Sequence, residues 1–119
     1  MLNDAVGFSE IYIVCGRTDL RYGIDSLAGV IRSIDIENPA TAGTLYLFCG
    51  RRSDRIKGLV WEGDGFLLLY KKLVNGSFQW PRNTSEVKSL TPKQFRWLME
   101  GLTIEPRKAV KEVSFEYMS

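Results

Sequence analysis

The chain has 119 residues, of which 45% are hydrophobic and 25% are charged, so it has the size of one domain and the composition of a globular protein. It contains no histidine, which excludes a Ser-His or Cys-His nucleophile pair, a histidine-ligated zinc site and an imidazole proton shuttle. The net charge of +2 gives no strong overall attraction to nucleic acid or to an anionic membrane. We therefore expect one domain over residues 1–119, with a tail of uncertain structure over 106–119, and no cofactor.

The first predicted elements are a strand and a helix. Residues 10–15 read EIYIVC, a β-branched and aromatic run closed by Gly16, which is typical of a strand. Apolar residues then recur at helical spacing over residues 20–35, with Asp19 as the N-cap and Asn38-Pro39 as the stop. The single apolar stripe of this helix predicts that it lies on a sheet.

The middle of the chain, residues 43–81, has the pattern of antiparallel strands throughout. Four apolar runs (TLYLFC, RIKGLVW, FLLLYKKL and SFQW) are separated by polar, glycine-rich segments. Asn75-Gly76 between two such runs is a strong hairpin signal, because a type I′ turn needs positive φ at both central residues. A second tight turn is expected at residues 62–65. Together these patterns predict a four-stranded meander.

A second helix follows, in which Thr91 is the expected N-cap, Pro92 stands at the first helical position and Gly101 lies near the C-cap. Its apolar stripe consists of Phe95, Leu98, Met99 and Leu102. The predicted fold class is α+β: a mostly antiparallel sheet, in the order strand, helix, four-stranded meander, helix, with both helices packed on one face. The tail after Pro106 suits a helix and a strand equally well.

The hairpins predict which side chains share a face, because side chains alternate along a strand and a two-residue turn pairs residues of opposite parity. One face then carries Arg55, Lys57, Leu59, Trp61, Phe66, Leu68, Tyr70 and Lys72. The other carries Ile56, Gly58, Val60, Leu67, Leu69, Lys71 and Leu73, with Phe78 and Trp80. We expect the second face to be the core under both helices. The first suits a partner protein or nucleic acid, with Trp61, Phe66, Tyr70 and Lys72 as candidate partner-binding residues. A three-residue turn would exchange the faces.

Positive charge is concentrated in the meander, because residues 47–82 contain seven basic and three acidic residues. Arginine in an exposed loop can make bidentate contacts to phosphate, which lysine cannot match. The candidate nucleic-acid-binding residues are Arg17, Arg21, Arg51, Arg52, Arg55 and Lys57. The alternative is structural: these residues form a solvated face, and Asp25 and Asp54 pair with arginines to hold the loops.

Catalysis would have to use carboxylates, since metal-dependent nucleases need two or three of them converging on Mg²⁺. The spacing of Asp19, Asp25 and Asp54 does not select such a set, so we expect no catalytic residues, no metal site and no enzyme activity. A metal-dependent nuclease using these three carboxylates is the less favoured alternative.

Cys15 and Cys49 lie in apolar runs and are expected to be buried free thiols, with a disulfide as the alternative. The N-terminus resembles no signal peptide and no run reaches membrane-spanning length, so we expect a cytoplasmic protein.

Two motifs resemble those of one family. Residues 16–27 (GRTDLRYGIDSL) are similar to the pattern G-x-T-D-(M/L)-R-x-G-x-D-x-L, and residues 48–57 (FCGRRSDRIK) are similar to F-x-x-R-R-x-D-R-(I/L)-K. The segments WEGDGF, YKKL and GSFQWP and the final helix follow in the family's order, so the resemblance covers roughly residues 11–104. The family is the small TnpB-type accessory protein encoded by the second open reading frame of transposable elements of the insertion sequence sixty-six group.

The resemblance implies a role in transposition and DNA recombination. In that family the DDE transposase is a separate, larger protein, and the small protein assists it. The implied partners are element DNA, the transposase or another element-encoded protein, with no membrane partner. The alternative to DNA binding is a purely protein-binding module, and the sequence leaves open whether the protein forms homo-oligomers.

Overall fold

A computed structural model of the protein describes residues 2–4, 7–34 and 41–104. Its elements, in chain order, are η1 (Leu2–Asp4), β1 (Glu10–Val14), α1 (Ile24–Ser33), β2 (Thr44–Cys49), β3 (Arg55–Trp61), β4 (Phe66–Lys72), β5 (Val87–Leu90) and α2 (Pro92–Met99). The α+β class is confirmed. The predicted helix stop at Asn38-Pro39 and the tail over 106–119 lie outside the described residues.

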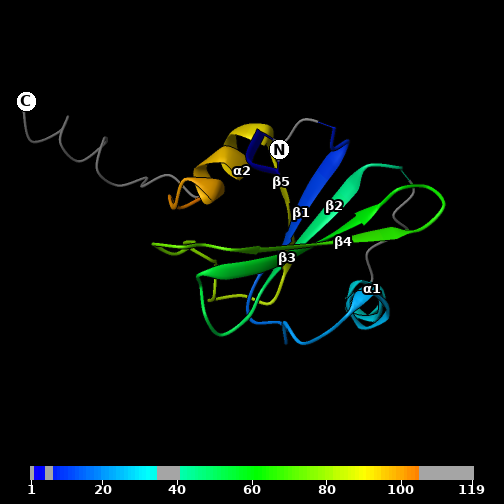
Figure 1. Ribbon diagram of the computed structural model, residues 1–119, viewed down its shortest axis with the longest axis horizontal. Coiled ribbons are helices and arrows are strands. Elements are labelled where there is room, and N and C mark those ends of the chain that lie inside the picture. The colour runs from blue at the N-terminus through cyan, green and yellow to red at the C-terminus, as the bar shows by residue number, and fades with distance from the viewer. Residues whose placement is uncertain (1, 5–6, 35–40, 105–119) are drawn as a thin grey trace, which may run out of the picture.

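The five strands form one sheet in the order β4-β3-β2-β1-β5 (Figure 1). β1 and β2 are parallel, with Ile11 opposite Leu45, and α1 lies in the connection between them. The other three strand pairs are antiparallel; the β2–β3 and β3–β4 pairs were predicted, and the β1–β5 pair was not. The parallel pair has a direct consequence for the site, because the loops that follow β1 and β2 leave the sheet at the same end.

The register of the β3–β4 hairpin confirms the predicted faces. Trp61 lies opposite Phe66, and Gly58 lies opposite Leu69. The Glu62 amide donates to the Gly65 carbonyl oxygen at 2.9 Å, which closes an even-numbered turn. Because the turn does not have three residues, side chains keep the alternation expected from the sequence.

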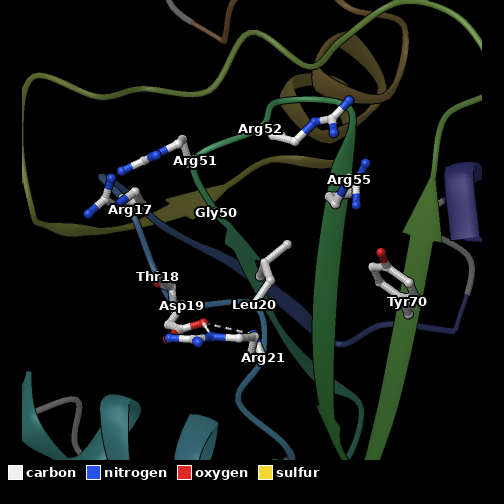
Figure 2. A pocket seen from close by; sticks show the side chains of 10 residues that line it. All are labelled: Arg17, Thr18, Asp19, Leu20, Arg21, Gly50, Arg51, Arg52, Arg55 and Tyr70. Carbon is white, nitrogen blue, oxygen red and sulfur yellow. Dashed lines mark hydrogen bonds and ion pairs between the residues drawn. The ribbon is translucent and has the colours of Figure 1, made fainter.

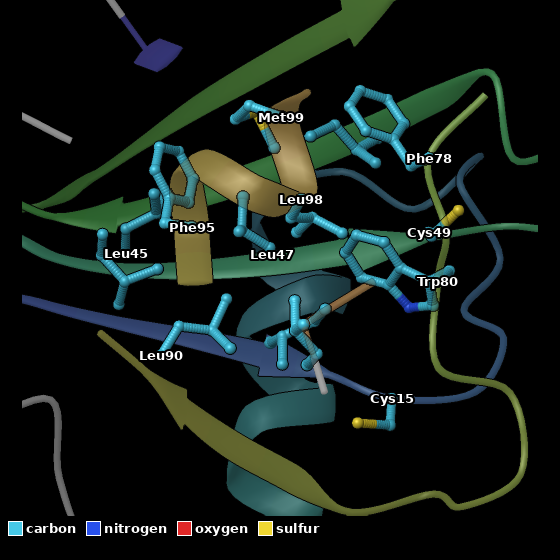
Figure 3. Packing of buried hydrophobic residues seen from close by; sticks show 14 of the residues in the cluster. Cys15, Leu45, Leu47, Cys49, Phe78, Trp80, Leu90, Phe95, Leu98 and Met99 are labelled. Atoms are coloured by element: carbon cyan, nitrogen blue, oxygen red, sulfur yellow. The ribbon is translucent and has the colours of Figure 1, made fainter. Parts of the chain in front are cut away.

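The two helices cover opposite faces of the sheet, so the prediction that both pack on one face is wrong (Figure 1). Under α2, the buried residues Phe95, Leu98 and Met99 join a cluster with Leu45 and Leu47 of β2 (Figure 3). Under α1, a separate cluster consists of Val14, Leu27, Ala28, Ile31, Tyr46, Phe48 and Leu59. All six residues of β2 are buried, because this central strand is covered on both sides.

The predicted fourth strand of the meander is also corrected. Residues 77–80 form no strand, and the sheet is completed instead by β5, which pairs with β1. Phe78 and Trp80 do lie on the predicted core face, where both are buried in the α2 cluster. The indole Nε1 of Trp80 donates to the Val14 carbonyl oxygen at 3.1 Å. The SFQW segment therefore packs its aromatic rings across the end of the sheet rather than extending it.

Helix α2 begins as predicted. The Thr91 hydroxyl accepts from the Gln94 amide at 3.1 Å, and the Gln94 side chain accepts from the Thr91 amide at 2.9 Å, which completes a capping box. At the other end, Gly101 has φ +80°, and the Leu102 amide donates to the Trp97 carbonyl oxygen at 2.8 Å. This left-handed glycine cap ends the helix.

Helix α1 begins later than predicted, at Ile24 rather than near Leu20. Asp19 does not cap it. Its carboxylate accepts from the Arg21 backbone amide at 2.9 Å, so residues 19–22 form a turn outside the helix. The N-cap is Gly23, which has extended backbone and no capping side chain. Within the described ranges, no helix is both long enough and apolar enough to cross a membrane.

Candidate functional site

Two loops meet at the end of the sheet where β1 and β2 finish. The first arginine loop, residues 15–23, follows β1 and carries Arg17 and Arg21. The second arginine loop, residues 50–54, follows β2 and carries Arg51 and Arg52. The Thr18 amide donates to the Cys49 carbonyl oxygen at 2.9 Å and joins the first loop to the end of β2. The parallel pairing of β1 and β2 is what brings these two basic segments together.

The two loops and the adjoining ends of β3 and β4 line an open pocket of about 770 Å³, which we call the arginine pocket (Figure 2). Its lining consists of Arg17, Thr18, Asp19, Leu20, Arg21, Gly50, Arg51, Arg52, Arg55 and Tyr70. Five of the six predicted nucleic-acid-binding residues line it, and Lys57 does not. Tyr70, which the sequence placed among the partner-binding residues, lines it instead.

Three of the five arginines are held by carboxylates. Arg21 forms a bidentate contact with Asp19, in which Nη2 lies 2.7 Å and Nε 3.0 Å from the carboxylate oxygens. Hydrogen bonds from Arg21 lower the pKa of Asp19 to about 2. Arg55 and Arg52 share Asp54, at 2.9 Å and 3.6 Å, and the hydrogen bond from Arg55 lowers the pKa of Asp54. Both carboxylates therefore stay ionised at neutral pH.

Arg17 and Arg51 differ from the other three arginines. Both are exposed, and neither forms an ion pair with any residue in the described part of the chain. The site as a whole has five guanidinium groups and the two carboxylates of Asp19 and Asp54, so its formal charge is +3. An anion entering the pocket would meet two guanidinium groups whose hydrogen-bond donors are not used by any residue in the described ranges.

Arg82 links the two arginine loops by hydrogen bonds to each of them. Its guanidinium donates to the Gly16 carbonyl oxygen at 3.2 Å in the first loop and to the Ser53 hydroxyl at 3.3 Å in the second. The second loop is also held from the β4 side, where the Phe78 amide donates to the Ser53 carbonyl oxygen at 2.7 Å. The pocket is thus built on a backbone that is fixed from several directions.

Gly50 allows the two loops to approach closely. A Cβ at this position would lie 3.1 Å from Cγ of Leu20 and 3.4 Å from the Thr18 carbonyl oxygen. A larger residue would push the first loop away from the end of β2, so the absence of a side chain here shapes the floor of the pocket.

Both cysteines are free and buried, as expected. The Cys49 thiol lies directly beneath the second arginine loop, where it donates to the Arg55 carbonyl oxygen at 3.5 Å and accepts from Arg82 at the same distance. Burial raises the pKa of the Cys49 thiol. It therefore stays protonated at neutral pH and acts as a small packing residue rather than a nucleophile.

The four predicted partner-binding residues do not lie together. Trp61 and Phe66 contact each other at the turn end of the hairpin, with ring centroids 5.0 Å apart and the rings tilted by 59°, and Phe66 packs against the α1 cluster. Tyr70 and Lys72 lie at the opposite end of β4. The face that was expected to be open is therefore partly covered by α1. Lys57, on the same face, donates to the Tyr22 carbonyl oxygen at 2.8 Å.

The three carboxylates considered for metal-dependent catalysis have different environments. Asp19 and Asp54 are bound by arginines, and Asp25 is exposed in the first turn of α1. Among the described residues, no three His, Cys, Asp or Glu side chains come together as a metal-binding group. The structural alternative for the arginines is correct in one respect, because Asp54 does pair with two of them, whereas Asp25 forms no ion pair with an arginine among the described residues.

Sequence reasoning missed Leu20, Gly50 and Arg82 as parts of the site. Leu20 was assigned to the start of the predicted helix, directly after the expected N-cap Asp19. Arg82 was counted among the basic residues of the meander, but it was not assigned to the site. Tyr70 could have been found, since the hairpin register places it opposite Lys57 and diagonal to Arg55.

Comparison with known proteins agrees with the motifs in these loops. The family model described as "IS66 Orf2 like protein" matches residues 9–109. Two similar proteins come from Sinorhizobium fredii (strain NBRC 101917 / NGR234). "Uncharacterized protein y4hO" is 33% identical over 93 residues, covering 78% of this chain and 80% of that protein. "Uncharacterized protein y4jC" is 30% identical over 104 residues, covering 86% and 88%. No solved structure matches significantly. The matched residues include both arginine loops and every strand and helix from β1 to α2, and the chain belongs to the IS66 Orf2-like family.

Proposed function

We propose that this protein is a non-catalytic accessory factor of DNA transposition that binds element DNA through the arginine pocket. One observation carries the proposal: five arginines from two loops and a strand converge on one pocket, and Arg17 and Arg51 lack a carboxylate partner within the described residues. A set of guanidinium groups at one point, backed by rigid loops, is suited to a polyanion with closely spaced phosphates.

Family membership supports the transposition part of the proposal, because IS66 Orf2-like proteins are encoded by insertion sequence elements. The non-catalytic part is supported by the engagement of Asp19 and Asp54 with arginines, which withdraws them from metal binding. Reduced, buried thiols suit a reducing compartment, so we place the protein in the cytoplasm with its DNA and with the element's transposase.

The test is a salt titration of DNA binding, followed by fluorescence anisotropy. The probe is a duplex from the end of the element that carries a short single-stranded overhang. With a site charge of +3, the slope of log K against log salt should be about −3, since each neutralised phosphate contributes about −0.9. The double variant Arg17→Ala with Arg51→Ala should flatten this slope by about 2.

Arg96→Ala is the matched control, because Arg96 is an exposed arginine on α2, across the sheet from α1 and outside the arginine pocket. It should leave the slope unchanged within about 0.5, since it meets no phosphate. Absence of binding at about 50 mM salt, where phosphate contacts are strong, would refute the proposal. An equal loss from Arg96→Ala and from the double variant would do the same.

The second candidate, a purely protein-binding module, is favoured by one observation, the half-buried Trp61–Phe66 pair. Size-exclusion chromatography with the transposase separates the two candidates. If the protein acts only through this pair, Trp61→Asp abolishes the complex and Arg51→Ala with Arg52→Ala preserves it. Under our proposal, the arginine variants lose DNA from any assembly that the transposase forms.

A further inference from the structure

We infer that the arginine pocket receives an unpaired nucleotide, with its phosphate at Arg17 and Arg51 and its base against Tyr70 and Leu20. This inference rests on the proposed DNA-binding function and specifies the form of DNA that the pocket takes. A protein with such a site would bind strand ends, overhangs or opened duplex in preference to continuous double helix.

The shape of the site supports an unpaired nucleotide. The backbone of a duplex is a convex ridge, and a protein that binds it needs only an exposed basic surface. Here the arginines line a hollow of about 770 Å³ that is open to solvent, and its volume lies in the range of pockets that bind small organic ligands. A nucleotide released from base pairing can enter such a hollow, whereas a base inside the double helix cannot.

Arg17 and Arg51 lie across the pocket from the aromatic ring of Tyr70, and Arg55 lies beside that ring. In Figure 2, Leu20 projects between these two sides of the pocket. The arginines without carboxylate partners thus stand apart from the aromatic ring. A phosphate and a base, joined through a sugar, have the same separation of charge from flat apolar surface.

Tyr70 has the properties of a stacking platform. It stands on the edge strand β4 and keeps 57% of its surface exposed, although most large hydrophobic side chains of this sheet are buried. The Lys57 ammonium lies 5.8 Å from the centroid of its ring, which steadies the ring by a cation–π contact. Every base has a π-face, so a ring held in this way accepts any of them.

The two carboxylates in the pocket have a role in this inference, which is to orient arginine side chains. Asp19 and Asp54 accept hydrogen bonds from Arg21 and Arg55 and so direct these two guanidinium groups, and Arg52 lies 3.6 Å from Asp54. These three can then line the path of the strand, while Arg17 and Arg51 take the phosphate. A site meant only for general attraction to DNA would gain affinity from removing both carboxylates.

The experiment compares three labelled probes of the same sequence: a blunt duplex, the same duplex with a short overhang, and the single strand alone. Wild-type protein should bind the two probes with unpaired nucleotides at least about tenfold more tightly than the blunt duplex, since stacking of one base has an effect of that order. Tyr70→Ala should abolish this preference and leave blunt-duplex binding unchanged. Tyr70→Phe, which keeps the ring, should retain it.

Tyr22→Ala is the matched control, because Tyr22 is an exposed tyrosine of the first arginine loop whose side chain lies outside the pocket lining. It should retain the preference. Equal binding of all three probes, with no effect of Tyr70→Ala, would overturn this inference and leave the proposed function standing. No binding to any probe would overturn both. Displacement of the single strand by polyglutamate as efficiently as by unlabelled DNA would show a site for acidic peptides and would also overturn both.

Discussion

The placement of α1 and α2 on opposite faces can be tested by combining one substitution under each helix. Ile31 of α1 is 3% exposed and Leu98 of α2 is fully buried, and they belong to separate clusters. Ile31→Val removes one buried methyl group and should lower the free energy of unfolding by about 1 kcal/mol. Leu98→Ala leaves a larger cavity and should lower it by about 3 kcal/mol.

Because the sheet separates the two side chains and they share no cluster, the double variant should lose the sum, about 4 kcal/mol, with an interaction term below about 0.5 kcal/mol. The assay is urea denaturation, followed by tryptophan fluorescence and circular dichroism in parallel to check two-state behaviour. An interaction term above about 1 kcal/mol would place both residues in one core and refute the two-layer arrangement. A wild-type stability of several kcal/mol leaves the double variant measurable.

Three further predictions concern single groups. Thr91→Ala removes the capping box of α2 and should cost about 1 kcal/mol in urea denaturation; no loss would contradict the cap. The pKa of Asp19 is lowered to about 2, so its contact with Arg21 should stabilise the fold fully above about pH 4. This stabilisation should be lost as the pH falls through about 2. An NMR titration of the Asp19 carboxyl with a midpoint near the ordinary aspartate pKa would contradict the ion pair. Cys15 and Cys49 should resist a thiol reagent until the protein is unfolded in guanidinium, and rapid labelling of native protein would contradict their burial.

The elements that sequence reasoning predicted well are those with local chemical signals. Thr91 and Pro92 mark the start of α2 by a side-chain cap and a residue that lacks an amide hydrogen, and both act within a few residues. The β3–β4 register followed from the short, glycine-containing turn at residues 62–65. Neither prediction depended on contacts between distant parts of the chain.

The elements predicted wrongly depend on such contacts. Phe78 and Trp80 alternate as in a strand, but their burial against the end of the sheet produces the same pattern without strand pairing. β5 reads VKSL, which is too polar and short to stand out. The two-sided packing of the helices did have a signal, because TLYLFC shows no polar alternation and such runs are typical of strands covered on both faces.

Most of the arginines of the candidate site were predicted from the sequence, but their arrangement around one pocket was not. The basic loops were visible because arginine was concentrated there, but their meeting at one pocket depends on the parallel pairing of β1 with β2. The predicted order strand, helix, strand over residues 10–49 is compatible with this parallel pairing, but the hairpin signals in the rest of the sequence favoured an antiparallel sheet. Leu20 could be assigned to the site only once the positions of the two loops were known.

The most direct test of the account is an NMR titration of the arginine Nε–Hε signals with the overhang DNA. The signals of Arg17 and Arg51 should shift strongly and saturate together, because their guanidinium groups take up the phosphate. Those of Arg32 and Arg96, which lie on the helices outside the pocket, should stay in place. Shifts spread evenly over all the arginines, or confined to Arg32 and Arg96, would contradict the arginine pocket as the DNA-binding site.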